Sequence, residues 1–197
     1  MEQGSTFYPY IECLACRAVI AGYSDGTFRP GDSVTRGQLS KIVSNAAGFT
    51  DEPAGQTFQD VVPGSTFYLF VERMAIHGAV SGYACGGTGE PCGPNNLPYF
   101  RPQIAAIRGQ IAKIVALAAG LSGTPSEQIF EDVPPGHTYY QWIELLAQQG
   151  AMSGYPCGGA GEPCGPNNLP YFRPQALASR GQVTKIVSNV YFPVCAP

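Results

Sequence analysis

Residues 33–48 read SVTRGQLSKIVSNAAG, and two later stretches repeat this pattern: AAIRGQIAKIVALAAG at 105–120 and LASRGQVTKIVSNVYF at 177–192. Each stretch carries Arg-Gly-Gln followed by Lys-Ile-Val, and the arginines recur 72 residues apart. The apolar residues of each stretch recur at the three- and four-residue spacing of a helix that buries one face. The chain is therefore predicted to repeat one helical unit three times.

A second pattern precedes each of these stretches. It reads FYPYIECLACRAVIAGY at 7–23, FYLFVERMAIHGAVSGY at 67–83 and YYQWIELLAQQGAMSGY at 139–155. The loop between the two patterns is SDGTFRP in the first copy, whereas the later copies share a loop that is 12 residues longer and contains CGGxGEPC. We therefore divide the chain into three homologous repeats, at residues 1–50, 51–122 and 123–197.

Each repeat is expected to fold as helix–loop–helix. One such pair of helices cannot bury its own apolar face, but three pairs can close around a shared axis. Short extended segments, TFQDVVPGST at 57–66 and IFEDVPPGHT at 129–138, lead into the second and third repeats. The first repeat starts at GSTFY, so its lead-in is expected to be missing, removed or supplied by another molecule, unless the C-terminal YFPVCAP fills its place. The predicted fold is mainly α and pseudo-threefold.

The second helix of each repeat has a recognisable start. Thr35 with Gln38, and Ser179 with Gln182, form the pattern of a capping box, in which the two side chains bond the free N–H groups of the helix end. Ile107 stands at the same place in the second repeat. Because isoleucine has no side-chain acceptor, we expect a weaker or distorted helix start there.

Composition and charge exclude several classes of protein. Only 13% of residues are charged and the net charge is −3, which argues against a nucleic-acid partner. No apolar run approaches the length of a membrane span, and no signal peptide is visible, so a secreted chain would be a mature or trimmed form. The two histidines do not recur, and no hydrolase, metalloprotease or phosphate-binding motif occurs. We predict no enzymatic activity, no cofactor and no metal.

Seven cysteines point to an oxidising compartment outside the cell. Cys85 with Cys92, and Cys157 with Cys164, are expected to close small loops, the alternative being a zinc clip. Three thiols remain, and they are Cys13, Cys16 and Cys195. In a closed threefold body the chain ends are neighbours, so Cys195 is expected to bond Cys13 or Cys16. A Cys13–Cys16 bridge is the alternative, and the odd thiol could link molecules.

These motifs resemble the S-layer homology domain, in three consecutive copies that cover nearly the whole chain. The resemblance is carried by GYSDGTFRP (22–30), VTRGQ (34–38), FQDV (58–61) and FEDV (130–133). The CGGxGEPC insertion is similar to a variant from bacterial surface proteins of the Chloroflexota type. The resemblance implies a trefoil that anchors exported proteins non-covalently to the cell envelope. It also implies an anionic, often pyruvylated, cell-wall polysaccharide as ligand.

The family binds this ligand in grooves between repeats, and its motifs map onto named positions here. The arginine of its ITRAE-like motif corresponds to Arg36, Arg108 and Arg180, and its loop Asp-Gly corresponds to Asp25 and Gly26 of the first repeat alone. The glutamate after the arginine is replaced by glutamine in all three copies. With the caps included, the predicted glycan-binding residues are Arg36, Arg108, Arg180, Asp25, Gly26, Thr35, Gln38, Ser179 and Gln182.

Two roles are open for the recurring arginines. At the first turn of a helix, free backbone N–H groups and the helix dipole favour an anion, and a guanidinium suits a carboxylate. Alternatively, each arginine ties its helix to the next repeat through a recurring glutamate, Glu12, Glu72 or Glu144. Several aromatic residues could stack on sugars or pack in the core, and they are Tyr23, Phe28, Tyr83, Trp142 and Tyr155. The recurring lysines Lys41, Lys113 and Lys185 are interpreted as a solvated or salt-bridging face.

Two functions compete at this point. The first is a cell-surface module that attaches to wall glycan, and the second is a structural subunit whose copies assemble into a surface layer or filament. The low charge, the odd cysteine and the incomplete first repeat favour the second. Both place the protein outside the cell, with polysaccharide or further copies of itself as the partner.

Overall fold

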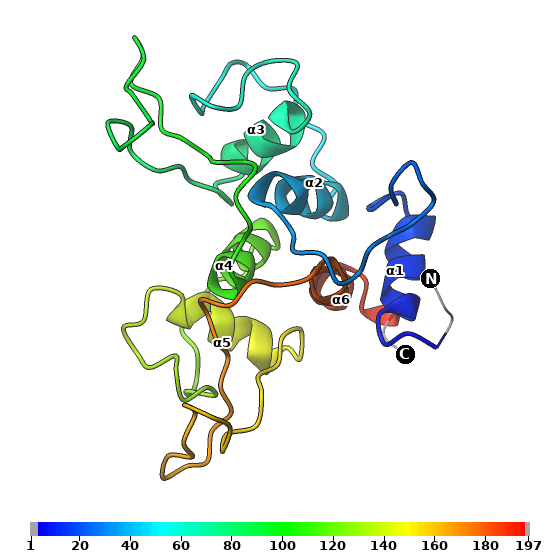
Figure 1. The fold of residues 1–197 in the computed structure, drawn as a ribbon, viewed down its shortest axis with the longest axis vertical. Helices are drawn as coiled ribbons and strands as arrows, with labels where there is room; N and C mark the ends of the chain where they lie inside the picture. The colour runs from blue at the N-terminus through cyan, green and yellow to red at the C-terminus, as the bar shows by residue number, and fades with distance from the viewer. Residues whose placement is uncertain (1–3, 196–197) are drawn as a thin grey trace.

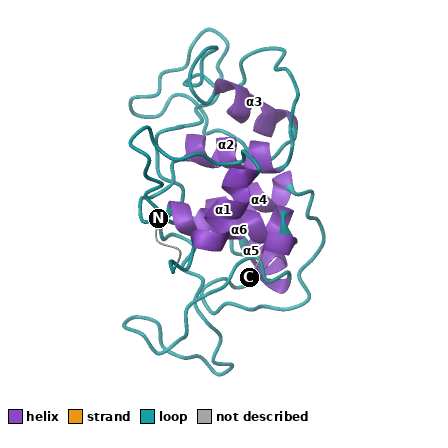
Figure 2. Cartoon of the chain, turned by 90° about the vertical axis from the view of Figure 1, so that its right-hand side faces the viewer, coloured by secondary structure: helices purple, strands orange, loops and turns teal. Residues whose placement is uncertain are grey.

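A computed structural model describes residues 4–195 and contains six α-helices within that range. They are α1 (Tyr8–Cys16), α2 (Arg36–Ala46), α3 (Tyr68–Ile76), α4 (Arg108–Ala118), α5 (Tyr140–Gln148) and α6 (Arg180–Tyr191), followed by the 3-10 turn η1 (Pro193–Cys195). The described residues form no strand, only isolated bridges, and long loops surround the helices (Figure 2). The mainly helical prediction is confirmed.

The helices are arranged in two shells with pseudo-threefold symmetry. The core helices α2, α4 and α6 pack against one another, and the outer helices surround them (Figure 1). Each outer helix packs on the core helix that precedes it along the chain, α3 on α2 and α5 on α4. The ring closes because α1 packs on α6, so the first and last helices are neighbours (Figure 1).

The core helices meet through their apolar stripes. Leu39, Ile111 and Val183 occupy the same position in α2, α4 and α6, and all three are fully buried. Val43, Val115 and Val187 lie one turn later and are also fully buried. Each such side chain contributes about 1.5–3 kcal/mol by leaving water, which a single helix pair could not achieve.

The start of each core helix is bonded to the loop of the next repeat. In α4 the N–H groups of Arg108 and Gly109 donate to the carbonyls of Ala176 and Pro174, at 2.8 and 2.9 Å. The corresponding amides of α2 and α6 donate in the same way to Ile104, Pro102, Asp32 and Pro30. These bonds satisfy the N–H groups that an uncapped helix would leave free.

The expected distortion at Ile107 is wrong. Although its side chain accepts no bond, Ile107 has the extended backbone of a normal cap, and α4 is as long as α2 at 11 residues. The side chain of Gln110 still accepts the N–H of Ile107 at 3.3 Å. The loop carbonyls of the third repeat, which bond the amides of Arg108 and Gly109, therefore hold the start of α4 without a cap hydroxyl.

The lead-in segments are bent rather than extended. The N–H of Val61 donates to the carbonyl of Phe58 at 3.2 Å, and that of Val133 donates to Phe130 at 3.3 Å. Both phenylalanines are buried with 1% of their surface exposed. The prediction of extended structure fails here because the aspartate and valine turn back onto the body of the repeat.

Three disulfides close the loops and the ring. Cys85–Cys92 and Cys157–Cys164 each span seven residues, and Cys13–Cys195 joins α1 to η1. The predicted bond between the chain ends is therefore made by Cys13, and the alternative Cys13–Cys16 bridge is wrong. Cys16 is a free, exposed thiol. None of the helices in residues 4–195 has the length and apolar character needed to cross a membrane.

We expect Gly109→Ala to destabilise the fold by about 1–2 kcal/mol, even though alanine favours helices by about 1 kcal/mol. A Cβ atom at Gly109 would overlap the ring of Tyr139, including its Cγ, which cannot swing away. Urea unfolding would measure the change. Gly55→Ala is the control, since its Cβ meets open space. Adding Tyr139→Leu should recover part of the loss, and no loss in the single variant would contradict this packing.

Candidate functional site

The three recurring arginines join each core helix to the next repeat. The Nε atom of Arg108 donates to the carbonyl of Phe172 at 2.8 Å, and its Nη2 donates to Ser153 at 2.9 Å. Its guanidinium lies 4.4 Å from the ring centre of Phe172. Arg36 and Arg180 make the same contacts with Phe100 and Ser81 and with Phe28 and Ala21. All three are buried, and burial lowers the pKa of Arg36 and Arg108.

The recurring glutamates do not contact these arginines. Glu72 accepts the N–H and hydroxyl of Thr57, and Glu144 accepts the N–H of Ile129 at 2.9 Å. Glu12 is exposed at the surface of α1. The arginines therefore do tie one repeat to the next, but through backbone carbonyls and aromatic rings rather than carboxylates.

The starts of α2 and α6 offer no free N–H groups to an anion. The first two amides of each core helix donate to loop carbonyls, as described above. The third amide in α2 and α6, that of Gln38 and Gln182, donates to the cap hydroxyls of Thr35 and Ser179 at 3.3 Å. The expected anion site built on free amides is wrong, because the neighbouring repeat occupies them.

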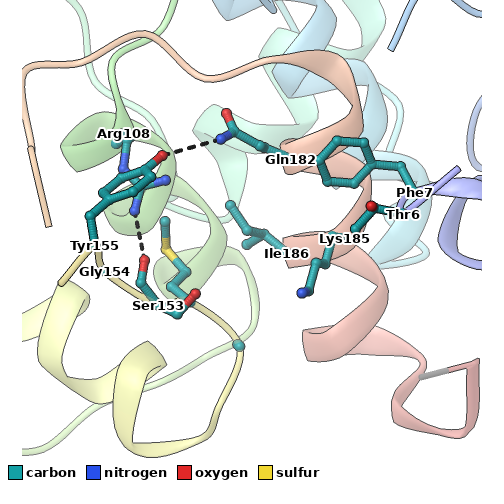
Figure 3. Close-up of a pocket in the computed structure, with 11 residues that line it drawn as sticks. Thr6, Phe7, Arg108, Ser153, Gly154, Tyr155, Gln182, Lys185 and Ile186 are labelled. Atoms are coloured by element: carbon teal, nitrogen blue, oxygen red, sulfur yellow. Dashed lines mark hydrogen bonds between the residues drawn. The ribbon is translucent and has the colours of Figure 1, made fainter. Parts of the chain in front are cut away.

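Two grooves related by the threefold symmetry lie between repeats. The α6 groove has a volume of about 240 Å³, and its polar lining residues include Arg108, Ser153, Tyr155, Gln182 and Lys185 (Figure 3). The α2 groove, of about 360 Å³, is lined at the same positions by Arg180, Tyr23, Gln38 and Lys41. No acidic side chain lines either groove. Both grooves therefore present cations and neutral hydrogen-bonding groups to a ligand.

Each groove places an amide and a phenol beside its cations. In the α6 groove the Nε2 atom of Gln182 lies 3.4 Å from the hydroxyl of Tyr155 (Figure 3). The oxygen of the same amide accepts the N–H of Ser179 at 2.9 Å, so the cap holds the glutamine in place. Lys185 lies at the other side of the groove (Figure 3). The sequence pattern predicted a solvated or salt-bridging face for these lysines and did not place them in a groove. Helical spacing alone does not show which surface the next repeat completes.

The third position in the ring differs from these two. Tyr139 stands where Phe7 and Phe67 line the other grooves. Burial raises the pKa of Tyr139, and nearby Tyr83 raises it further. The amide of Gln110 donates to the hydroxyl of Tyr83 at 2.9 Å. An additional hydroxyl therefore occupies this position.

Asp25 and Gly26 belong to neither groove. The carboxylate of Asp25 accepts the hydroxyl of Thr27 at 2.6 Å and pairs with Arg29 at 2.7 Å, and these contacts hold its pKa well below the usual range. In the later repeats Glu90 and Glu162, inside the disulfide loops, hold Arg101 and Arg173 at 2.7 Å. The insertion therefore preserves the same ion pair, which sequence reasoning did not recognise.

Glu144 gives the fold a testable pH dependence. It is fully buried, its Oε1 has no partner among the described residues, and burial raises its pKa to about 7. Because the folded pKa lies above the unfolded value of about 4.3, this group favours folding at low pH, and the contribution is lost between about pH 4.3 and 7.

We expect Glu144→Gln to reduce this decline, which is on the order of 2 kcal/mol, in thermal unfolding measured at pH 5 and pH 8. Ile129→Thr should stabilise the protein at pH 8, because Thr57 already supplies such a hydroxyl to Glu72. Glu52→Gln, at an exposed carboxylate, is the control. Equal pH dependence in Glu144→Gln and the parent chain would contradict the assignment.

Comparison with known proteins agrees with the sequence motifs. Residues 3–40 match the S-layer homology domain. The chain is 26% identical over 196 residues to an endoglucanase of Bacillus sp. (strain KSM-635), covering all of this chain and 19% of that protein. It is 22% identical over 179 residues to a cellulosome-anchoring protein of Acetivibrio thermocellus, covering 86% of this chain and 34% of that protein.

The chain thus spans about a fifth and a third of the length of these two relatives. Residues 3–40 are thus similar to the S-layer homology domain, in agreement with the motifs at 22–30 and 34–38.

Proposed function

We propose that this chain is a non-catalytic surface module that holds its protein on the cell envelope by binding anionic wall polysaccharide in the α2 and α6 grooves. The observation that carries the proposal is that both grooves combine a lysine, an arginine, a glutamine and a tyrosine without any acidic side chain. A carboxylate, such as a pyruvyl substituent on a sugar, suits this set of donors. The three disulfides, which are typical of exported proteins, and the name of the cellulosome-anchoring relative support the same function.

Within this proposal the predicted residues have different tasks. Lys41 and Lys185 meet the anion, with Gln38 and Gln182 as donors beside them. Arg108 and Arg180 border the grooves and contribute positive charge, but their main bonds hold the repeats together. Thr35 and Ser179 fix the glutamines through the caps, whereas Asp25 and Gly26 shape the loop of the first repeat.

Retention on purified wall polysaccharide tests the proposal. We expect Lys41→Gln combined with Lys185→Gln to weaken binding at least about tenfold, since each removes a charge-assisted contact. Retention should fall with salt and with removal of the pyruvyl groups. Lys113→Gln is the matched control, because Lys113 has the equivalent position in α4 but lines neither groove. Unchanged retention by the double variant would refute the proposed grooves.

A subunit that assembles into a surface layer or filament is the second candidate. The observation that favours it is an open hollow on the first repeat, described in the next section. Light scattering and negative-stain microscopy of the purified chain separate the two functions. Long regular particles without sugar would support assembly, and a monomer that binds glycan would support the anchor.

A further inference from the structure

The lead-in segment of the second repeat fills a specific site on the following helix and loop. Phe58 packs against Phe100, with ring centres 5.2 Å apart, and the two join a buried cluster with Val61 and Val71. Phe130 packs on Phe172 at 5.1 Å in the third repeat. Phe100 and Phe172 are fully buried as a result.

Polar contacts fix the same segments. The carboxylate of Asp60 accepts the N–H groups of Phe100 and Arg101, at 2.7 and 2.6 Å. Asp132 accepts those of Phe172 and Arg173, both at 2.7 Å. The residue before each phenylalanine donates its N–H to Glu72 or Glu144, as described above. Each Phe-x-Asp segment therefore meets an apolar hollow, two N–H donors and one carboxylate.

The first repeat has the same site, but nothing in residues 4–195 fills it. A hollow of about 200 Å³ is lined there by residues that include Tyr8, Ile11, Glu12, Ala15, Gly26 and Phe28. Phe28 is only partly buried, unlike Phe100 and Phe172, and Glu12 is exposed, unlike Glu72 and Glu144.

The hydrogen-bonding groups of this hollow have no partner among the described residues. Within the described residues the N–H groups of Phe28 and Arg29 donate to no acceptor, and Glu12 accepts no bond. The backbone of Arg29 has φ 56°, close to the 62° and 59° of Arg101 and Arg173. The two amides thus already have the conformation in which their counterparts bind an aspartate.

We propose that this hollow on the first repeat binds a Phe-x-Asp-Val segment carried by another polypeptide. The phenylalanine fills the hollow against Phe28, the aspartate accepts the N–H groups of Phe28 and Arg29, and the residue before the phenylalanine donates to Glu12. Residues 192–195 do not fill it, because none of them lines the hollow. The inference is independent of glycan binding, since the hollow shares only the Ile20–Gly22 stretch with the α2 groove.

A peptide of residues 56–64, QTFQDVVPG, is the probe, and its binding to the full chain is measured by calorimetry. We expect saturable binding together with slower hydrogen exchange at the amides of Phe28 and Arg29. Asp60→Asn in the peptide should weaken binding about tenfold and Phe58→Ala about a hundredfold. In the chain, Glu12→Gln should weaken it about tenfold, with Glu52→Gln as the matched control on an exposed carboxylate.

A fusion provides a second measurement that does not depend on peptide affinity. Adding Phe-Gln-Asp directly before residue 1 places the aromatic nine residues before Phe7, as Phe58 stands nine before Phe67. We expect this fusion to raise the Tm by several degrees, and the same fusion with alanine for phenylalanine to leave it unchanged.

The two measurements together decide the proposal. If the peptide does not bind at millimolar concentration and the fusion does not raise the Tm, the hollow is not a site for this segment. If the fusion stabilises the chain but the peptide fails to bind, the site acts within one chain and the proposed partner is refuted. Equal binding of a scrambled peptide would also overturn the proposal.

Discussion

Replacing both Cys13 and Cys195 by serine is expected to lower the free energy of unfolding by about 5 kcal/mol. The bond spans 182 residues, almost the whole chain, so it restricts the unfolded state more than any shorter bridge. The chain-entropy treatment gives about 5 kcal/mol for a loop of this size and about 2.5 kcal/mol for the seven-residue loops. The bond also holds α1 beside the end of α6, where the ring closes.

Urea unfolding of the double variant, made in a Cys16→Ser background, would measure this loss. The background matters because Cys16 lies one turn from Cys13 and is free to take its place. The double replacement of Cys85 and Cys92 in the same background is the control. A larger loss of unfolding free energy in that control than in the ring-closing variant would contradict the chain-entropy argument for the Cys13–Cys195 bond.

The repeat made most of the fold predictable. Three copies of one helical pattern imply that the copies share a core, and the burial of Leu39, Ile111 and Val183 at one position follows from that. The ring-closing bond was predictable for the same reason, although its choice of Cys13 over Cys16 was not. Both thiols lie on α1, and only the position of η1 distinguishes them.

The predictions failed where local structure depends on contacts far away in the sequence. Ile107 supplies no cap side chain, but the carbonyls of Ala176 and Pro174 in the third repeat hold the next two amides, those of Arg108 and Gly109. Local motifs describe a helix end by its own residues, so they cannot include acceptors about 65 residues away. The bent lead-in segments have the same origin, because Asp60 turns toward amides some 40 residues later.

The candidate site shows this limit most clearly. Arginines at a helix start resemble anion ligands in sequence, yet each points into the adjacent repeat and is buried there. Lys41 and Lys185, five residues after the arginines of the same helices, line the grooves as well. Which side of a helix faces a groove depends on how the repeats close, and helical periodicity does not contain that information.

Arg108→Ala is expected to destabilise the protein by about 3–5 kcal/mol. It removes two hydrogen bonds from a charged donor and leaves the carbonyls of Phe172 and Ser153 without it, each at a cost of about 1–3 kcal/mol. It also removes the contact with the Phe172 ring, 4.4 Å away, which adds about 0.5–2 kcal/mol. Arg108→Lys should recover only part of the loss, because an ammonium cannot span both carbonyls as the planar fork does.

The same variant separates the two roles of the arginine when stability and glycan retention are measured together. Arg17→Ala is the control, since Arg17 is exposed and its removal should change the free energy of unfolding by less than about 0.5 kcal/mol. If Arg108 holds two repeats together, Arg108→Ala should lower the urea midpoint of unfolding. If Arg108 serves only as a glycan ligand, retention should weaken at an unchanged midpoint, and that result would refute its structural role. The glycan retention of variants at Arg36, Arg108 or Arg180 can therefore be interpreted only together with their unfolding curves. The lysine variants leave the arginine bonds between repeats intact.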